Sequence, residues 1–171
     1  LQMESRIGFT FASGLRSVLR HDPDVVLVGE IRDAETADIA ISAALTGHLV
    51  FSTLHTNDAP GALTRLVDMN VEPYLVASAL EGVIAQRLLR SNCPHCRETE
   101  NLDDALYAEL REMLPSVDEK PEIFRGTGCP YCRFTGYHGR EPIFEILEMD
   151  DDLRTLTTHH ASTTDIQRAA V

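Results

Sequence analysis

Glu30 lies where a carboxylate could take part in nucleotide chemistry. Residues 25–28, Val-Val-Leu-Val, form a short apolar run rich in β-branched side chains, which is typical of a strand buried on both faces of a sheet. The run ends at Gly29-Glu30, which places an acid at the carboxyl edge of the strand, where open α/β sheets bind ligands. Nucleotide-hydrolysing proteins hold Mg²⁺ with an acid in this position. Glu30 is therefore a candidate Mg²⁺-side acid, and the alternative is a structural ion pair with Arg32.

A second group of polar side chains follows the next apolar run along the chain. Ser52, Thr53 and His55 come at the end of residues 48–53, a strand expected beside the one that precedes Glu30. An imidazole can donate a hydrogen bond to a phosphate oxygen, so His55 could sense a γ-phosphate. The alternative is a surface histidine in a turn. His48 begins the strand, and we expect it to have a structural role that joins helix and strand.

Four cysteines form two matched pairs that are suited to binding a metal ion. Cys93-Pro-His-Cys96 and Cys129-Pro-Tyr-Cys132 each place two residues between their thiols, so that one turn can present both sulfurs to the same ion. Two such turns complete a tetrahedron, and four filled positions indicate a structural Zn²⁺ site. Buried free thiols or a redox pair are the alternatives, and His95 could compete as a ligand.

The elements that must position these groups follow from apolar spacing and capping residues. Strand, helix and strand within about thirty residues predict a parallel βαβ unit with a right-handed crossover. After Cys93 the sequence becomes acidic and locally helical. The expected elements are a helix from Phe11 capped by Thr10, a strand at 25–28, a helix at 34–45 capped by Asp33, a strand at 48–53, helices at 62–69, 75–90 and 102–113, a loop at 115–121, a short strand at 142–147, and helical structure from 153 onward.

Composition and charge exclude several classes of protein. The chain has 171 residues, 43% of them hydrophobic, and a net charge of −12. That charge disfavours nonspecific nucleic-acid binding and docking on anionic lipid. No apolar run approaches the roughly 18 residues of a membrane span, so direct membrane insertion is not expected. Paired cysteines without a secretion signal favour a metal site in a reducing compartment.

Several of these motifs together resemble one known family. The string Arg20-x-x-Pro23-Asp24 followed by residues 29–33 (Gly-Glu-Ile-Arg-Asp) is similar to a motif of the ATPases that drive type II secretion and type IV pilus assembly, the GspE/PilB/PulE family. Residues 46–57 are similar to the histidine box of that family, and the likeness continues through residues 85–88 into the cysteine pairs. It covers nearly the whole chain.

The resemblance implies an α/β fold. It implies a partial RecA-like P-loop NTPase core, a parallel sheet with covering helices, in residues 1–92. A small tetracysteine zinc module with an acidic insert would follow in residues 93–136, and a C-terminal helical segment in residues 137–171.

The resemblance also implies a function and its site. The protein would be a homo-hexameric cytoplasmic ATPase that uses ATP, Mg²⁺ and Zn²⁺ and works beneath inner-membrane platform proteins. Glu30, His55, Arg16 and Arg20 would be catalytic, with the two arginines facing a neighbouring subunit's nucleotide. Gly29, Glu30, Thr53 and His55 would line the nucleotide. A solvated surface remains the alternative for each arginine.

Two parts of such an ATP site are missing from the sequence. The only lysine is Lys120, with no glycine-rich turn before it, so there is no P-loop. The upstream acidic box of the family, which carries the water-activating glutamate, is also absent. We therefore expect a fragment with about half of an ATP site that is inactive alone. The alternative function is a non-catalytic, zinc-dependent protein-docking module. The tetracysteine argues against the family's retraction motors, and secretion and pilus assembly stay equally open.

Overall fold

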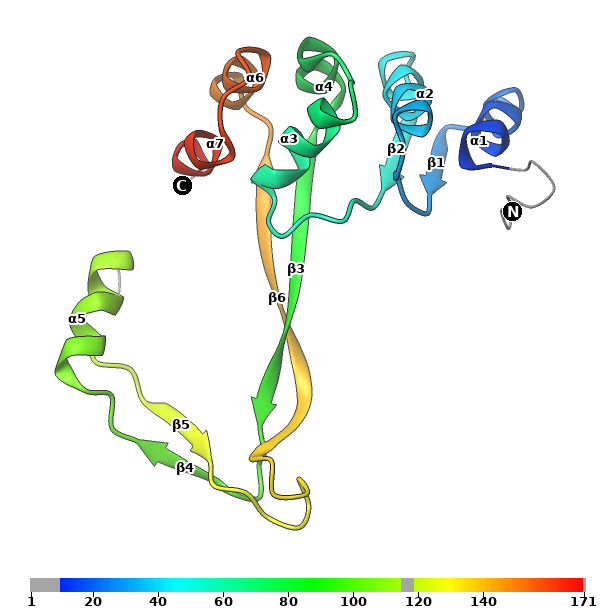
Figure 1. Cartoon of the computed structure of the whole chain (residues 1–171). Coiled ribbons are helices and arrows are strands. Elements are labelled where there is room, and N and C mark those ends of the chain that lie inside the picture. The colour runs from blue at the N-terminus through cyan, green and yellow to red at the C-terminus, as the bar shows by residue number, and fades with distance from the viewer. Residues whose placement is uncertain (1–9, 115–118, 171) are drawn as a thin grey trace. The chain divides into compact units, whose positions relative to one another are not determined.

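The computed structural model describes residues 10–114 and 119–170 (Figure 1). The chain divides into two compact units. Unit 1 comprises the residues up to 86 together with those from 144 onward, and unit 2 comprises residues 87–143. The division at residues 92/93 and 136/137 expected from the motifs is a different partition and stays a prediction.

The first half of unit 1 is a parallel βαβ unit, as predicted. Strand β1 pairs in parallel with strand β2, with Val25 opposite Leu49 and Val28 opposite Ser52. Asp33 accepts a hydrogen bond from the backbone N–H of Thr36 and so begins the connecting helix. The elements are α1 (Phe11–Leu19), β1 (Val25–Val28), α2 (Ala34–Leu45) and β2 (Leu49–Ser52).

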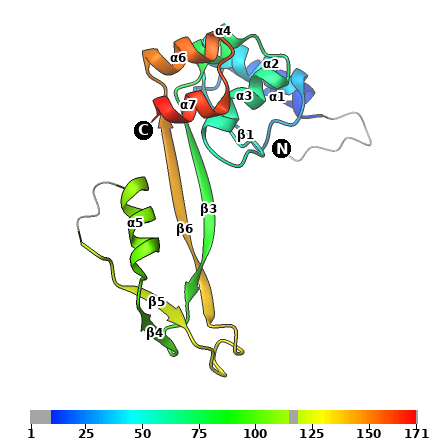
Figure 2. The same ribbon diagram turned by 60° about the vertical axis from the view of Figure 1, so that its left-hand side comes forward.

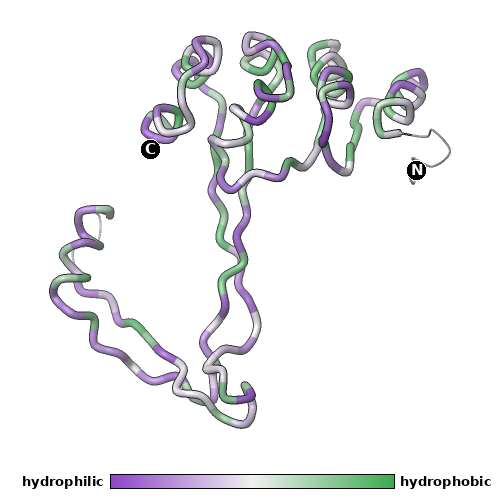
Figure 3. Tube along the Cα trace, in the orientation of Figure 1, coloured by the Kyte–Doolittle hydropathy of each residue, from purple (hydrophilic) through white to green (hydrophobic). Residues whose placement is uncertain are grey.

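Only one face of this strand pair is covered within the described residues. Figure 3 shows β1 as a continuous hydrophobic segment, but its side chains alternate between buried and exposed. Val26 and Val28 pack in a core cluster with residues of α1, α2 and a later helix, α4 (Pro73–Ala79). Leu27 is 76% exposed and Phe51 of β2 is 53% exposed. The prediction that these strands are buried on both faces is therefore wrong for the described chain, because its helices pack on one face only.

The region after α4 differs most from the sequence-based expectation. The predicted helix at 75–90 ends at Ala79, and residues 82–92 form a strand instead. That strand pairs with β6, which extends the predicted short strand at 142–147 in both directions. The elements are α3 (Pro60–Asp68), α4 (Pro73–Ala79), β3 (Gly82–Asn92) and β6 (Tyr137–Glu148).

Backbone contacts explain why a strand forms here. The N–H of Met149 donates to the carbonyl of Glu81, and the N–H of Cys93 donates to the carbonyl of Gly136, so β3 and β6 run in opposite directions (Figure 2). A Cβ atom on Gly82 would lie 3.0 Å from the Leu147 carbonyl oxygen, a tight contact that glycine avoids at this close approach of the two strands. The paired residues are separated by 43 residues at one end of the strands (Cys93 and Gly136) and by 68 at the other (Glu81 and Met149), so local helical periodicity carries no sign of the pairing.

The C-terminal helices complete unit 1 and confirm the helical structure predicted from residue 153 onward. Helices α6 (Asp151–Thr158) and α7 (Thr163–Ala169) pack against α4 and α3, respectively. A second core cluster joins them to Leu63 of α3 and Leu147 of β6. Glu145 of β6 accepts a hydrogen bond from the N–H of Ala59 at 2.9 Å, which satisfies one backbone donor at the start of α3.

Unit 2 contains the cysteines and the acidic segment. The antiparallel strands β4 (Arg97–Glu100) and β5 (Ile123–Gly126), which the sequence analysis did not predict, flank helix α5 (Asp104–Met113). Helix α5 lies within the predicted helical segment 102–113 and confirms it. Most of the loop predicted at 115–121 lies outside the described residues. None of the described helices is both long and apolar enough to cross a membrane.

Candidate nucleotide-binding and metal-binding sites

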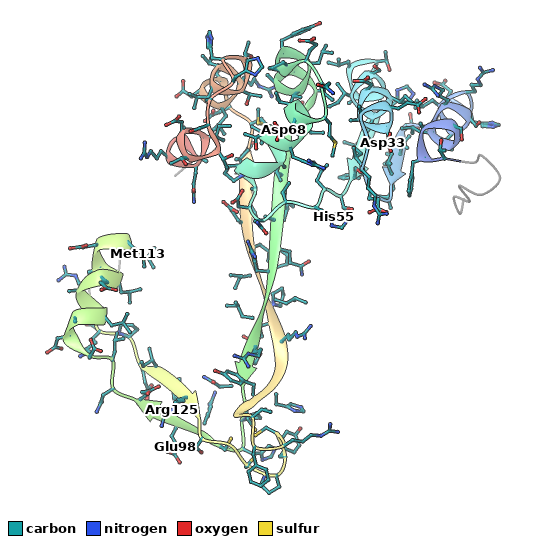
Figure 4. All side chains as sticks on the ribbon, in the orientation of Figure 1. Asp33, His55, Asp68, Glu98, Met113 and Arg125 are labelled. Atoms are coloured by element: carbon teal, nitrogen blue, oxygen red, sulfur yellow. The ribbon has the colours of Figure 1, made fainter. Side chains whose placement is uncertain are left out.

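The carboxyl ends of β1 and β2 bring Glu30 and His55 together. His55 Nε2 lies 3.1 Å from Glu30 Oε2, and because an ionised carboxylate only accepts, the ring N–H donates. Arg32 Nε lies 2.7 Å from the same oxygen. The Glu30 side chain is 20% exposed, whereas that of His55 is 77% exposed. His55 lies in the connection from β2 to α3, where it is open to a ligand (Figure 4).

Two hydrogen bonds hold the strand ends in register at this site. The Thr53 hydroxyl donates to the Gly29 carbonyl at 2.8 Å, and the Ile31 N–H donates to the Thr53 carbonyl at 3.0 Å. Gly29 and Thr53, both expected to line a nucleotide, thus join the two strands immediately beside Glu30. Ile31 lies between Glu30 and Arg32 and is buried in the core cluster, so its side chain anchors both neighbours.

The electrostatics of the pair keep Glu30 ionised. The hydrogen bond from His55 is the largest cause that lowers the pKa of Glu30 below its ordinary value of 4.5. Partial desolvation opposes this effect, and Arg32 lowers the pKa of Glu30 further by hydrogen bonding and charge. An anionic carboxylate can hold a divalent cation, and an imidazole beside it can donate a hydrogen bond to a phosphate oxygen.

The arginines at the end of α1 lie apart from this pair. Arg16 Nη1 forms an ion pair with Glu35 of α2 at 2.8 Å. Arg20 follows the last residue of α1 and is exposed. Among the described residues neither arginine forms an ion pair with Glu30, so their expected role toward a neighbouring subunit stays a prediction.

His48 has the structural role that its place at the start of the strand predicts. Its Nδ1 lies 3.0 Å from the carbonyl of Ala43 and 3.3 Å from the Thr46 hydroxyl. The side chain therefore joins the end of α2 to the start of β2, on the side of the unit where β2 begins.

The four cysteines converge on one point. Their sulfurs all lie within 4.8 Å of one another. The pairs Cys93–Cys129 and Cys96–Cys132 are 3.9 Å apart, and Cys129–Cys132 is 3.8 Å apart. Four sulfurs about 2.3 Å from a central ion would form a tetrahedron with edges of about 3.8 Å. The geometry therefore fits Zn²⁺, and the sulfur separations are too long for disulfide bonds.

Backbone donors around the sulfurs also suit a thiolate site. The N–H groups of Gly128 and Gly136 donate to Cys96 Sγ and Cys132 Sγ, each at 3.3 Å. The backbone N–H of Cys129 is the largest cause that lowers the pKa of Cys132 to about 6, whereas desolvation raises the pKa of Cys96 to about 12. A cation between the sulfurs would favour the thiolate of every ligand.

His95 is not part of the sulfur cluster. Its ring packs against Tyr131 with centroids 4.2 Å apart, and the Tyr131 ring in turn packs against His138 at 4.5 Å. Among the described residues the candidate metal ligands are the four cysteines alone. The expectation that His95 could compete as a ligand is not supported by this arrangement.

Sequence reasoning missed two partners of the site region. Glu35 pairs with Arg16, and its position in the first turn of α2 was the signal available, because acids are common there. Glu145 supports the start of α3, which follows the His55 segment. No local signal identifies Glu145, because it comes from a strand 86 residues further along the chain.

Solved structures place this fold in a known class. The chain is similar to the pilus retraction motor PilT, with a TM-score of 0.60 and 30% identity over 94% of this chain and 34% of that chain. It is also similar to the ATPase DotB of Legionella pneumophila, with a TM-score of 0.56 and 26% identity over 94% of this chain and 33% of that chain. The fold is therefore that of the RecA-like traffic ATPases.

Sequence comparison is more specific than the fold. The model of the Type II/IV secretion system protein family matches residues 1–171, and the chain belongs to that family. It is 55% identical to the type II secretion system ATPase E of Vibrio cholerae, over 91% of this chain and 30% of the relative. It is 50% identical to the type II secretion system protein E of Pseudomonas aeruginosa, over 99% of this chain and 33% of the relative.

A pilus protein is also among the relatives. The chain is 45% identical to the type IV pilus assembly ATPase TfpB of Acinetobacter baylyi, over 99% of this chain and 29% of the relative. The chain thus spans about a third of the length of the curated relatives it matches.

Proposed function

We propose that this chain supplies the Mg²⁺ side of an ATP site in a longer ATPase that powers type II secretion or type IV pilus assembly. The observation that carries the proposal is the carboxylate of Glu30, which His55 and Arg32 hold at the carboxyl ends of two parallel strands. Glu30 would hold Mg²⁺, directly or through water, and His55 would contact the γ-phosphate. When bound, Mg²⁺ neutralises phosphate charge during phosphoryl transfer.

The remaining roles follow from the same proposal. Gly29 and Thr53 fix the strand ends on which the nucleotide would rest. Arg16 and Arg20 would act across a subunit boundary in a hexameric ring, since forked guanidinium donors match phosphate oxygens. The ring would work in the cytoplasm beneath inner-membrane platform proteins, with no membrane insertion of its own.

The site needs groups that this chain does not contain. The sequence has a single lysine and no glycine-rich phosphate-binding turn. The lysine and the water-activating glutamate would come from the part of a longer protein that the curated relatives have and this chain does not span. The isolated chain would therefore be inactive.

Replacement of Glu30 in the full-length protein tests the proposal. Glu30→Gln keeps the size of the side chain and removes its charge, so ATP turnover should fall by about 10²-fold or more while nucleotide binding remains. Turnover is measured as phosphate release, and binding by the fluorescence of a labelled ATP analogue.

A matched control separates the site from a general charge effect. Glu72→Gln removes an equal charge from an exposed side chain of the same unit and should leave turnover unchanged. Turnover of the Glu30→Gln protein equal to that of the control would remove Glu30 from the site.

A second candidate function rests on the sulfur cluster. Four sulfurs at tetrahedral spacing support a structural Zn²⁺ held by Cys93, Cys96, Cys129 and Cys132. In this alternative the zinc module and its acidic insert dock another protein without catalysis. The two functions are compatible in one full-length ATPase, and a P-loop upstream in the full gene distinguishes the ATPase from a docking module alone.

A further inference from the structure

Helix α5 presents an apolar stripe that unit 2 does not cover. None of its ten residues, all of them described, is buried. Leu106, Leu110 and Met113 are spaced by four and three residues and so share one face of the helix. Leu106 is 51% exposed and Met113 is 74% exposed, whereas Leu110 is half-buried. Figure 4 shows Met113 on this helix.

Acidic side chains flank the stripe on one side. Glu109 is three residues from Leu106 and four from Met113, so it adjoins both on the helix surface. Glu112 lies one turn beyond Glu109. Neither glutamate forms an ion pair with a described residue, whereas Asp104 is paired with Lys120 at 2.9 Å. Residues 97–114 carry six acidic and two basic side chains, so the surroundings are negative as well.

The helix is well capped although none of its residues is fully buried. Asp103 accepts a hydrogen bond from the N–H of Leu106 at 2.7 Å and begins the helix. Asp104 in the first turn and Arg111 in the last turn complement the helix dipole. An exposed apolar stripe on a helix of this length is normally buried by a partner, because packing supplies most helix stability.

We propose that the α5 stripe, formed by Leu106, Leu110 and Met113 with Glu109 and Glu112 beside it, docks a basic amphipathic helix of another protein. Apolar side chains of the partner would cover the stripe, and its lysines or arginines would face the two glutamates. This inference deepens the docking role proposed for the zinc module and rests on it, but it requires no ATP hydrolysis.

The charges disfavour the other simple occupants of the stripe. An anionic lipid surface would be repelled by Glu109 and Glu112, which lie beside the apolar residues that would have to enter it. A second copy of α5 would place the same glutamates near one another across the contact, which is unfavourable. A basic partner turns the same charges into an attraction that also steers its orientation.

Titration with a designed peptide tests the inference. The probe is a labelled peptide of about five helical turns, with leucines at every third or fourth position and lysines beside them. A second peptide has glutamate in place of each lysine. Binding to the zinc-loaded chain, without nucleotide, is measured by fluorescence anisotropy. We expect the lysine peptide to bind, more weakly as salt is raised, and the glutamate peptide not to bind.

Variants of the chain locate the binding surface. Leu106→Ser with Met113→Ser should weaken binding about tenfold or more, since both side chains would lose their burial. Glu109→Lys with Glu112→Lys should weaken binding and reduce its salt dependence. Leu89→Ser is the matched control, because Leu89 on β3 is also 51% exposed. Circular dichroism checks that each variant keeps its helices.

Several results would overturn the inference. The inference is wrong if the lysine peptide does not bind or if the two peptides bind equally. It is also wrong if the serine variant binds as well as the Leu89→Ser control. Binding to vesicles of phosphatidylserine, or self-association that the serine substitutions abolish, would assign the stripe to another occupant. If hydrogen exchange of residues 10–86 became faster in the serine variant, the occupant of the stripe would be unit 1 of the same chain. Loss of the ATPase role would change none of these outcomes.

Discussion

Glu30 acquires its properties from contacts that cross between two strand ends. Its oxygen Oε2 meets both the imidazole of His55 and the guanidinium of Arg32. These contacts keep the carboxylate anionic and fixed in direction, although it is partly exposed. A carboxylate held in this way can exchange its protein donors for a cation, while the released donors turn to phosphate oxygens when a nucleotide is bound.

The lowered pKa of Glu30 gives a prediction at the scale of one residue. His55→Ala removes its largest cause, so the pKa of Glu30 should rise toward 4.5. The measurement is an NMR titration of the side-chain carboxyl carbons of glutamate. His159→Ala, a substitution immediately after α6 and outside the site, is the control and should leave the pKa of Glu30 unchanged.

The lowered pKa of Glu30 also determines how the contacts of this residue change the stability of the fold with pH. Because the pKa of Glu30 is lower in the folded chain than in the unfolded chain, its contacts stabilise the fold above about pH 4.5. That contribution is lost as the pH falls through the lower pKa of the folded state. An unchanged pKa of Glu30 in the His55→Ala chain would contradict the hydrogen bond.

At the scale of elements, capping residues and apolar spacing predicted the helices and strands that depend on neighbouring residues in the sequence. Capping by Thr10 and Asp33, together with apolar spacing, identified α1 and α2, and the parallel βαβ connection is confirmed. Because parallel strands end at one edge of a sheet, the sequence also indicated that Glu30 and His55 would meet, and they do.

The missed elements depend on partners far along the chain. Residues 82–90 were predicted to be helical because their apolar residues fit a helical period, but pairing with β6 makes them part of a strand. Strands β4 and β5 are four residues each and pair across the acidic segment, so neither has a strong local pattern. The exposure of Leu27 and Phe51 was missed for a related reason, since sequence does not show how many layers cover a sheet.

The cysteine module gives a prediction at the scale of elements. The chain should bind one Zn²⁺, with Zn–S distances of about 2.3 Å by X-ray absorption. Unit 2 has few buried apolar side chains to order it, so chelation should increase hydrogen exchange in residues 93–140 much more than in the βαβ elements. Addition of Zn²⁺ should restore protection.

Substitution of single ligands checks the same claim. Cys→Ser at any of the four positions should lower the zinc content found by elemental analysis and loosen the same region. Metal-free protein purified under reducing conditions, with four freely titrating thiols and unchanged protection of residues 93–140, would contradict the zinc site.

At the scale of the whole molecule, the chain corresponds to one part of longer relatives. It belongs to the Type II/IV secretion system protein family, and it spans about a third of the relatives it matches. One face of β1 and β2 is exposed along Leu27 and Phe51, and the sequence has no phosphate-binding turn. Both observations are expected if other parts of a longer protein cover this face and complete the ATP site.

The most direct measurement is ATP turnover by the isolated chain and by the full-length protein, side by side in Mg²⁺. Phosphoryl transfer depends on positioned positive charge, and the isolated chain lacks the P-loop lysine. We predict turnover at the background rate for the isolated chain and measurable turnover for the full-length protein. Turnover of about 1 s⁻¹ or more by the isolated chain, free of contaminating ATPases, would contradict the account.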